Sequence, residues 1–147
     1  VWWLFVGSGM DSPEIQELVN KNPCKDRIVL AGHRKDAPAI VAACQVSVLA
    51  SLKREGLPKT VIEAMAYGVA PVVSDTGGSA ELVVDHKSGI IVQPGDATAI
   101  AEAVERLYRD EPLRERMGAA ARARIESHFN VNQTVEQHHE FFRKILA

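Results

Sequence analysis

Residues 46–78 read VSVLASLKREGLPKTVIEAMAYGVAPVVSDTGG, and this segment is the most informative about the fold. The run Val46–Ala50 is short, apolar and rich in valine, which predicts a buried strand. The segment Pro58–Tyr67 predicts a helix, and Gly68 directly after it is a typical helix C-cap. Pro71–Ser74 is a second short apolar run. A strand, a helix and a strand in such close succession form a crossover between parallel strands.

The same alternation extends in both directions along the chain. Further strands are expected at Val1–Val6, Arg27–Ala31 and Gly89–Val92, with helices between them. Trp2 and Trp3 point to opposite faces of the first strand, and core packing is expected for both. Five short strands alternating with helices predict an α/β fold, a Rossmann-like parallel sheet with helices on both faces.

After Pro94-Gly95-Asp96 the pattern is helical only. Helices are expected over Thr98–Tyr108, from Pro112 to about His128, and from about Val131 to Leu146. We expect one domain over residues 1–147, with an α/β core at 1–96 and trailing C-terminal helices at 97–147. Acidic residues interleave with the basic residues here, which predicts a solvated, salt-bridged helix face for Arg106, Arg109, Arg114, Arg116, Arg122 and Arg124.

Composition narrows the classes of partner. The chain carries 17 Lys and Arg against 19 Asp and Glu, a net charge of −2, which gives no electrostatic basis for binding nucleic acid. Cys24 and Cys44 lack metal-ligand spacing, and no apolar run reaches the roughly 20 residues that span a bilayer. We expect reduced thiols, no bound metal, no nucleic-acid partner and a cytoplasmic protein.

Glycine and polar residues gather where the expected strands end. These loops are Gly7–Gly9, Gly32–Arg34, Ser51–Pro58 and Asp75–Gly78. In an open parallel sheet, ligands bind at the carboxyl ends of the strands. The sequence therefore predicts a ligand site formed by these four loops.

The loop Ser51–Pro58 and its helix match an extended ligand. A helix N-terminus near Pro58 offers free N–H groups to a phosphate, and Gly56 lets a ligand approach the backbone. Glu55 lies before the helix and Glu63 more than one turn inside it, so the two carboxylates would bind separate diols on either side of the phosphate. Two glutamates at this spacing also arise by chance, and on spacing alone an ordinary surface role stays open.

Additional residues in this region form a longer ordered pattern. The run comprises Glu55-Gly56-Leu57-Pro58, Glu63-Ala64-Met65-Ala66, Gly68, Pro71-Val72-Val73, Asp75, Gly77-Gly78 and Glu81. It closely resembles the donor-site signature of the retaining glycosyltransferase family 4, the group 1 glycosyltransferases. The resemblance extends over nearly the whole chain.

This resemblance implies that the chain is the C-terminal, donor-binding half of a GT-B fold. It implies a reaction that transfers a hexose from a UDP-, GDP- or ADP-sugar. The transfer would proceed with retention at the anomeric carbon and without a metal or cofactor. It implies that Glu55 is the catalytic carboxylate, beside the donor hexose. The implied donor sugar and phosphate contacts are Gly7, Gly9, Gly56, Leu57, Pro58, Lys59 and Thr60. The implied nucleoside contacts are Gly32, His33, Arg34 and Glu63. For His33 and Arg34, an ordinary exposed loop position remains an alternative.

The chain begins without methionine, inside an expected strand, so we expect a piece of a longer protein. The resemblance implies that an N-terminal acceptor domain and the family's basic diphosphate-binding pair lie outside it. The isolated chain is then expected to be inactive, and an exposed sheet edge would favour a dimer or a domain swap. The acceptor would be a sugar or a lipid-linked sugar, the latter with peripheral membrane association of the parent. The alternatives are a non-catalytic nucleotide-sugar-binding module and another GT-B enzyme such as a nucleotide-sugar epimerase.

Overall fold

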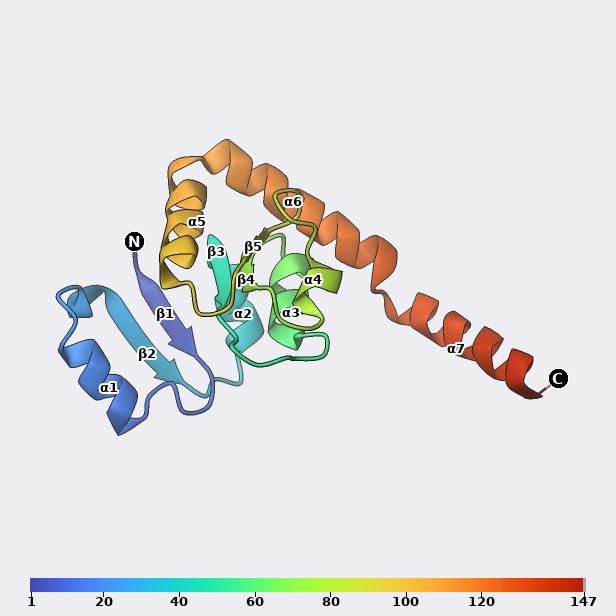
Figure 1. Ribbon diagram of the computed structural model, residues 1–147, viewed down its shortest axis with the longest axis horizontal. Helices are drawn as coiled ribbons and strands as arrows, with labels where there is room; N and C mark the ends of the chain where they lie inside the picture. Colours follow the sequence, from blue (N-terminus) through green and yellow to red (C-terminus); the bar gives the residue numbers. More distant parts are fainter. Residues whose placement is uncertain (147) are drawn as a thin grey trace. The chain divides into compact units, whose positions relative to one another are not determined.

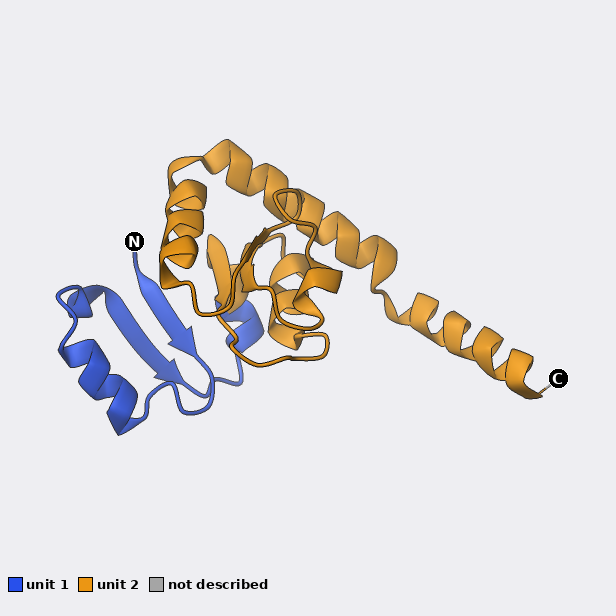
Figure 2. Cartoon of the chain, viewed as in Figure 1, with its two compact units in different colours: residues 1–40 blue, residues 41–147 orange. Residues whose placement is uncertain are grey.

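The computed structural model describes residues 1–146. The chain divides into two compact units, residues 1–40 and residues 41–147 (Figure 2). The helix α2 (Ala37–Ala42) carries the chain from the first unit into the second.

The first unit is a strand–helix–strand crossover. Its parallel strands are β1 (Trp3–Val6) and β2 (Ile28–Gly32), with α1 (Pro13–Asn20) and a short 3-10 turn (Lys25–Arg27) between them. The expected strands are confirmed, but β1 begins two residues later than predicted, after Trp2. Core packing was expected for Trp2, and this expectation is wrong. Trp2 lies before the paired residues of β1 and is 71% exposed.

The second unit contains a three-stranded parallel sheet. Its order is β3 (Val46–Leu49), β4 (Ala70–Ser74) and β5 (Ile90–Val92), so β4 is central and buried at every residue. The crossover from β3 to β4 contains α3 (Lys59–Ala66), and that from β4 to β5 contains α4 (Ser79–Leu82). The parallel α/β prediction is confirmed, and the five strands pair as two sheets within the described residues.

Three helices follow the last strand: α5 (Ala97–Arg109), α6 (Glu111–His128) and α7 (Val131–Leu146). An aspartate caps each of the first two. The Asp96 carboxylate accepts a hydrogen bond from the Ala99 amide (2.8 Å), and Asp110 accepts one from Leu113 (2.9 Å). The helices α3 and α5 lie on opposite sides of the sheet (Figure 1). Every described residue of α7 is exposed.

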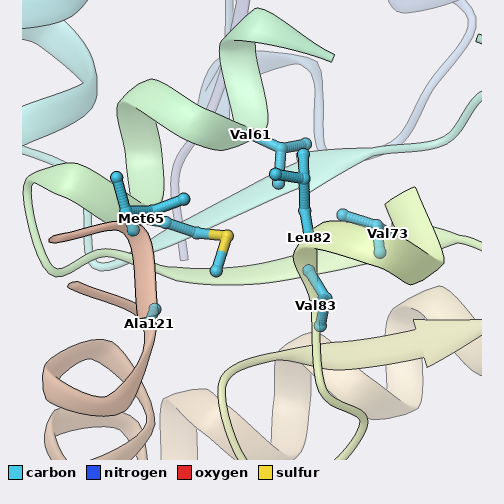
Figure 3. Close-up of a cluster of buried hydrophobic side chains, with 7 residues drawn as sticks. Val61, Met65, Val73, Leu82, Val83 and Ala121 are labelled. Atoms are coloured by element: carbon cyan, nitrogen blue, oxygen red, sulfur yellow. The ribbon is translucent and has the colours of Figure 1, made fainter. Parts of the chain in front are cut away.

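One apolar cluster joins the sheet to α3, α4 and α6 (Figure 3). Its buried members are Val61, Met65, Val73, Leu82, Val83, Ala121 and Ile125. The backbones of α6 and α3 approach closely beside it, where a Cβ on Gly118 would collide with the carbonyl of Gly68. The core thus fixes α3 and α4, the two helices that follow the polar loops of this unit.

Candidate functional site

The N-terminus of α3 is open to a ligand. Pro58 is buried and is the N-cap, with φ −70° and ψ 113°, so the helix begins at Lys59, one residue later than predicted. Extended backbone at this position removes Pro58 from the helix, and no side chain caps the first turn. Within residues 1–146, neither the Lys59 amide nor the Thr60 amide has a hydrogen-bond partner. Two free N–H groups at a helix start favour an anion.

The loop before α3 rests on the turn before α4. The Gly78 amide donates a hydrogen bond to the Glu55 carbonyl (3.1 Å). Gly77 has φ +55°, and a Cβ on it would collide with the same carbonyl, while a Cβ on Gly78 would lie 2.8 Å from the carbonyl carbon of Gly56. The Gly77-Gly78 turn was predicted to lie beside this loop, and the hydrogen bond confirms it. Both positions require glycine, because a Cβ at either one would collide with the loop backbone.

The Glu55 side chain is held by a residue that the sequence analysis missed. Ser51 lies two residues past the end of β3, and its hydroxyl donates a hydrogen bond to Oε1 of Glu55. The rest of the Glu55 side chain is exposed. Over Gly56 the space is empty, because a Cβ there would have no neighbour within 4 Å. A ligand can therefore approach the Gly56 backbone next to an oriented carboxylate.

Glu63 lies one turn further along α3, on the face opposite the core residues. Its side chain is 26% exposed, and Lys59 Nζ lies 3.5 Å from its Oε1, with the lysine side chain 87% exposed. The helix start at Lys59 thus separates two carboxylates, Glu55 before it and Glu63 within it. Glu55, Gly56, Lys59 and Glu63 therefore follow one another along the loop before α3 and the first turns of that helix.

Leu57 is exposed in the loop before α3, and the remaining predicted residues belong to the first unit. Gly7 directly follows β1 and Gly32 ends β2, and the Gly7 amide donates to the Gly32 carbonyl (2.8 Å). Gly9 follows in the same turn with φ +82°, and a Cβ on it would meet no atom within 4 Å. Gly32 has φ +60°, and a Cβ on it would collide with the Asp11 carboxylate. These three glycines therefore come together at the carboxyl end of the two strands.

Arg34 is engaged within its own loop. Its Nε and Nη2 donate to the two carboxylate oxygens of Asp36 at 2.8 and 2.7 Å. This hydrogen bonding lowers the pKa of Asp36 below its ordinary value and raises the pKa of Arg34. His33 is exposed. The Asp36 partner was missed, although a carboxylate two residues from an arginine was visible in the sequence.

The predicted solvated, salt-bridged face holds for Arg109 and Arg122 but not for Arg114 or Arg124. The Arg114 side chain is 15% exposed, and its Nη1 donates to the Leu107 carbonyl (3.0 Å). Ion pairs join Arg109 to Glu105, Arg114 to Glu111 and Arg122 to Glu126, at 2.7, 2.8 and 2.8 Å. For Arg124 the solvated-face prediction is wrong, because its guanidinium donates to the carbonyls of Glu81 and Leu82 at 2.7 Å each. Helical periodicity in the sequence cannot reveal this contact, because the carbonyls of Glu81 and Leu82 belong to a segment far from Arg124 in the chain.

Neither a metal cluster nor a membrane helix is found in the described part of the chain. Residues 1–146 contain no group of three His, Cys, Asp or Glu side chains that could hold a metal ion. None of the helices in this range is long and apolar enough to cross a membrane.

Comparison with known proteins identifies a family and a fold. The family described as "Glycosyl transferases group 1" matches residues 1–124. The capsular polysaccharide biosynthesis glycosyltransferase CapM of Staphylococcus aureus is 34% identical over 131 residues, covering 86% of this chain and 33% of CapM. The UDP-Gal:alpha-D-GlcNAc-diphosphoundecaprenol alpha-1,3-galactosyltransferase of Escherichia coli is 33% identical over 113 residues, covering 77% of this chain and 29% of that enzyme.

The architecture matches a solved structure over almost all of the chain. The crystal structure of Anabaena Alr3699/HepE in complex with UDP superposes with a TM-score of 0.90 at 24% identity, covering 98% of this chain and 41% of that one. At this identity the likeness shows the fold. The chain spans about a third of the length of the curated relatives that it matches.

Proposed function

The chain belongs to the group 1 glycosyltransferases, and we propose that it is the donor-binding part of an enzyme that transfers a hexose from a nucleotide-diphosphate sugar. The observation that carries the proposal is the open helix start at Lys59 and Thr60, with Glu55 on one side and Glu63 on the other. A sugar, a diphosphate and a ribose follow one another in such a donor in the same order.

Each residue of this segment has a proposed role. Glu55 lies against the donor hexose near the reacting carbon, in the orientation that its hydrogen bond with Ser51 gives it. The open space over Gly56 admits the sugar and phosphate, which the backbone at Leu57, Lys59 and Thr60 then contacts. Pro58 has no N–H and supplies the turn into α3 instead.

The ribose diol is the proposed ligand of Glu63. A partly buried carboxylate accepts two hydroxyl hydrogen bonds more strongly than a neutral group does. Lys59 is close enough to balance the charge of this carboxylate or to contact the diphosphate. For the first unit, taken by itself, the proposed contacts are Gly7 and Gly9 with phosphate and Gly32, His33 and Arg34 with a nucleoside.

The transfer itself is proposed to proceed with retention at the anomeric carbon and without a metal. The free amides of α3 and its dipole stabilise the leaving diphosphate where a divalent cation would otherwise act. The E. coli relative, named for a UDP-sugar donor and a lipid-linked acceptor, supports a nucleotide-sugar donor and a sugar or lipid-linked acceptor. The acceptor would bind outside this chain. The parent protein would act in the cytoplasm, and it would lie at the inner face of the membrane if its acceptor is lipid-linked.

Calorimetry on the full-length protein with UDP-, GDP- and ADP-sugars tests the proposal. We expect one nucleotide class to bind and Glu63→Gln to weaken that binding by about 10- to 100-fold, because charged hydrogen bonds are lost. Glu105→Gln is the matched control, since Glu105 is exposed and pairs with Arg109 on its own helix. Absence of binding by every nucleotide sugar overturns the proposal, and binding without hexose transfer to any acceptor identifies a non-catalytic module.

A further inference from the structure

The side chain of Arg124, on α6, contacts the backbone of α4. Its Nε donates to the Leu82 carbonyl and its Nη2 to the Glu81 carbonyl, both at 2.7 Å. The guanidinium carbon lies 5.6 Å from the centroid of the Phe129 ring, within cation–π range. One side chain of α6 thus fixes the C-terminal end of α4, a segment about 40 residues earlier in the chain.

The helix α4 is a single turn with little stability of its own. It spans Ser79–Leu82, and its last carbonyls have no turn of helix after them to satisfy them. The planar fork of Arg124 supplies two donors to adjacent carbonyls, which an arginine near a helix C-terminus does well. Leu82 and Val83 are buried against the core from the same short segment. The arginine and the core together determine where α4 lies.

The other end of α4 meets the proposed donor loop. The Gly78 carbonyl accepts from the amides of Glu81 and Leu82, both at 3.1 Å, so the turn before α4 and the end of α4 are linked directly. The Gly78 amide in turn donates to the Glu55 carbonyl (3.1 Å). A continuous series of contacts therefore runs from Arg124 through α4 to the backbone of Glu55.

We propose that Arg124 is a positioning residue for the donor site: it holds α4 in place and thereby sets the Gly78 turn on which the Glu55 loop rests. The inference rests on the proposed function, in which Glu55 acts beside the donor sugar. Arg124 itself contacts no residue of that site.

The effect of losing Arg124 should be selective. Glu63 and the free amides at Lys59 and Thr60 belong to α3, which the core holds through Val61 and Met65 without help from Arg124. Nucleotide affinity is then retained, while the Glu55 carboxylate is displaced from the reacting carbon. We expect kcat to fall about tenfold in Arg124→Met, because small displacements of a reacting group are costly, with the donor KM changed by less than about twofold.

Three further variants of the full-length protein separate positioning from general stability. Arg122→Met removes an exposed ion pair on the same helix and should leave kcat unchanged. Ile125→Val trims a buried core residue of α6 and should lower Tm without lowering kcat. Arg124→Lys can replace only one of the two hydrogen bonds, so an intermediate kcat is expected. The proposal is overturned if Ile125→Val, at the same Tm as Arg124→Met, loses as much kcat as that variant does. It is also overturned if Arg124→Met changes the donor KM and leaves kcat unchanged.

Amide hydrogen exchange tests the same link without catalysis. The Gly78 amide should exchange about tenfold faster in Arg124→Met than in the wild type or Arg122→Met, because the local opening that frees it becomes easier. If Gly78 exchange is unchanged, the positioning role is wrong even where the enzyme is active. If exchange rises but no nucleotide sugar binds the wild-type protein, the structural link holds and the proposed function fails.

Discussion

The Gly78 amide donates a hydrogen bond to the Glu55 carbonyl at 3.1 Å, and this bond joins the loops on either side of α3 and β4. The two loops leave neighbouring parallel strands, β3 and β4, at their carboxyl ends. The Glu55 side chain is exposed and held by the Ser51 hydroxyl, while its backbone carbonyl accepts from Gly78. The site therefore combines an accessible carboxylate with a rigid support, which is the arrangement that a positioned catalytic group needs.

Substitution of Gly78 by alanine should separate the two loops. The new methyl group would lie 2.8 Å from the carbonyl carbon of Gly56 and 3.0 Å from the Leu57 amide nitrogen, so backbone must move. We expect Tm to fall by several degrees, since overpacking against backbone costs about 1–3 kcal/mol. Differential scanning calorimetry measures the change. A variant with wild-type Tm would mean that the loops are not packed as described.

Gly56→Ala is the complementary change. A methyl group there meets no atom within 4 Å, and its backbone φ lies outside the left-handed region, so Tm should match the wild type. The same methyl group would occupy the space proposed for the donor. We expect the Kd for the nucleotide sugar to rise about tenfold, a loss of about 1.4 kcal/mol, by isothermal titration calorimetry. Unchanged affinity would show that the donor does not approach this backbone.

Gly118→Ala tests the close approach of α6 and α3. Alanine normally stabilises a helix interior, but here its Cβ would collide with the Gly68 carbonyl. We expect a loss of about 1–3 kcal/mol in the free energy of unfolding, measured by urea denaturation. Ala119→Ser, at an exposed position of the same helix, serves as the control and should change it by about 0.5 kcal/mol or less.

Asp36 should titrate below the ordinary range of an aspartate. The hydrogen bonds from Arg34 favour the charged carboxylate and lower its pKa in the folded protein. The stabilisation from this pair is present above the unfolded-state pKa and is lost as the pH falls through the lower folded-state pKa. Carbon-detected NMR titration measures it, and Arg34→Gln should return the Asp36 pKa toward its ordinary value. A pKa that does not respond to Arg34→Gln contradicts the pairing.

Ser51→Ala should impair transfer while leaving the fold intact. The Ser51 hydroxyl orients the Glu55 carboxylate, so its removal frees that side chain to rotate. We expect a several-fold fall in kcat, on the order of a single hydrogen bond of about 1 kcal/mol, with unchanged Tm. Ser127→Ala is the control, because Ser127 is an exposed residue outside the site. Equal kcat values for the two variants would remove Ser51 from the site.

Local patterns were sufficient to predict most of the fold. Apolar runs located the five strands to within one or two residues, because buried parallel strands have few polar residues. The start of α3 was misplaced by one residue because proline suits both the N-cap and the first turn. The contact of the Arg124 side chain with α4 could not be predicted, since no periodicity in the sequence relates Arg124 to Leu82.

The residues of the candidate site also divide into those that the sequence pattern indicates and those that it does not. Glu55, Gly56 and Glu63 could be proposed from the sequence because they are close together in it and lie on one strand–helix connection. Ser51 was missed because a serine hydroxyl after a strand has no distinctive spacing. Arg34 was found, but its partner Asp36 was not. Side-chain pairing depends on loop geometry, which the sequence indicates only where glycine or proline restricts the backbone.

The contribution of α6 to the core has a consequence for synthesis on the ribosome. Met117, Ala121 and Ile125 are buried in the second unit, and Arg124 anchors α4, yet all four residues are made after every strand of the sheet. A nascent chain that has emerged only through β5 still exposes the apolar faces of α3 and α4. The loops that carry Glu55 and Gly78 therefore take their final arrangement late, when translation has passed α6 and that helix has left the exit tunnel.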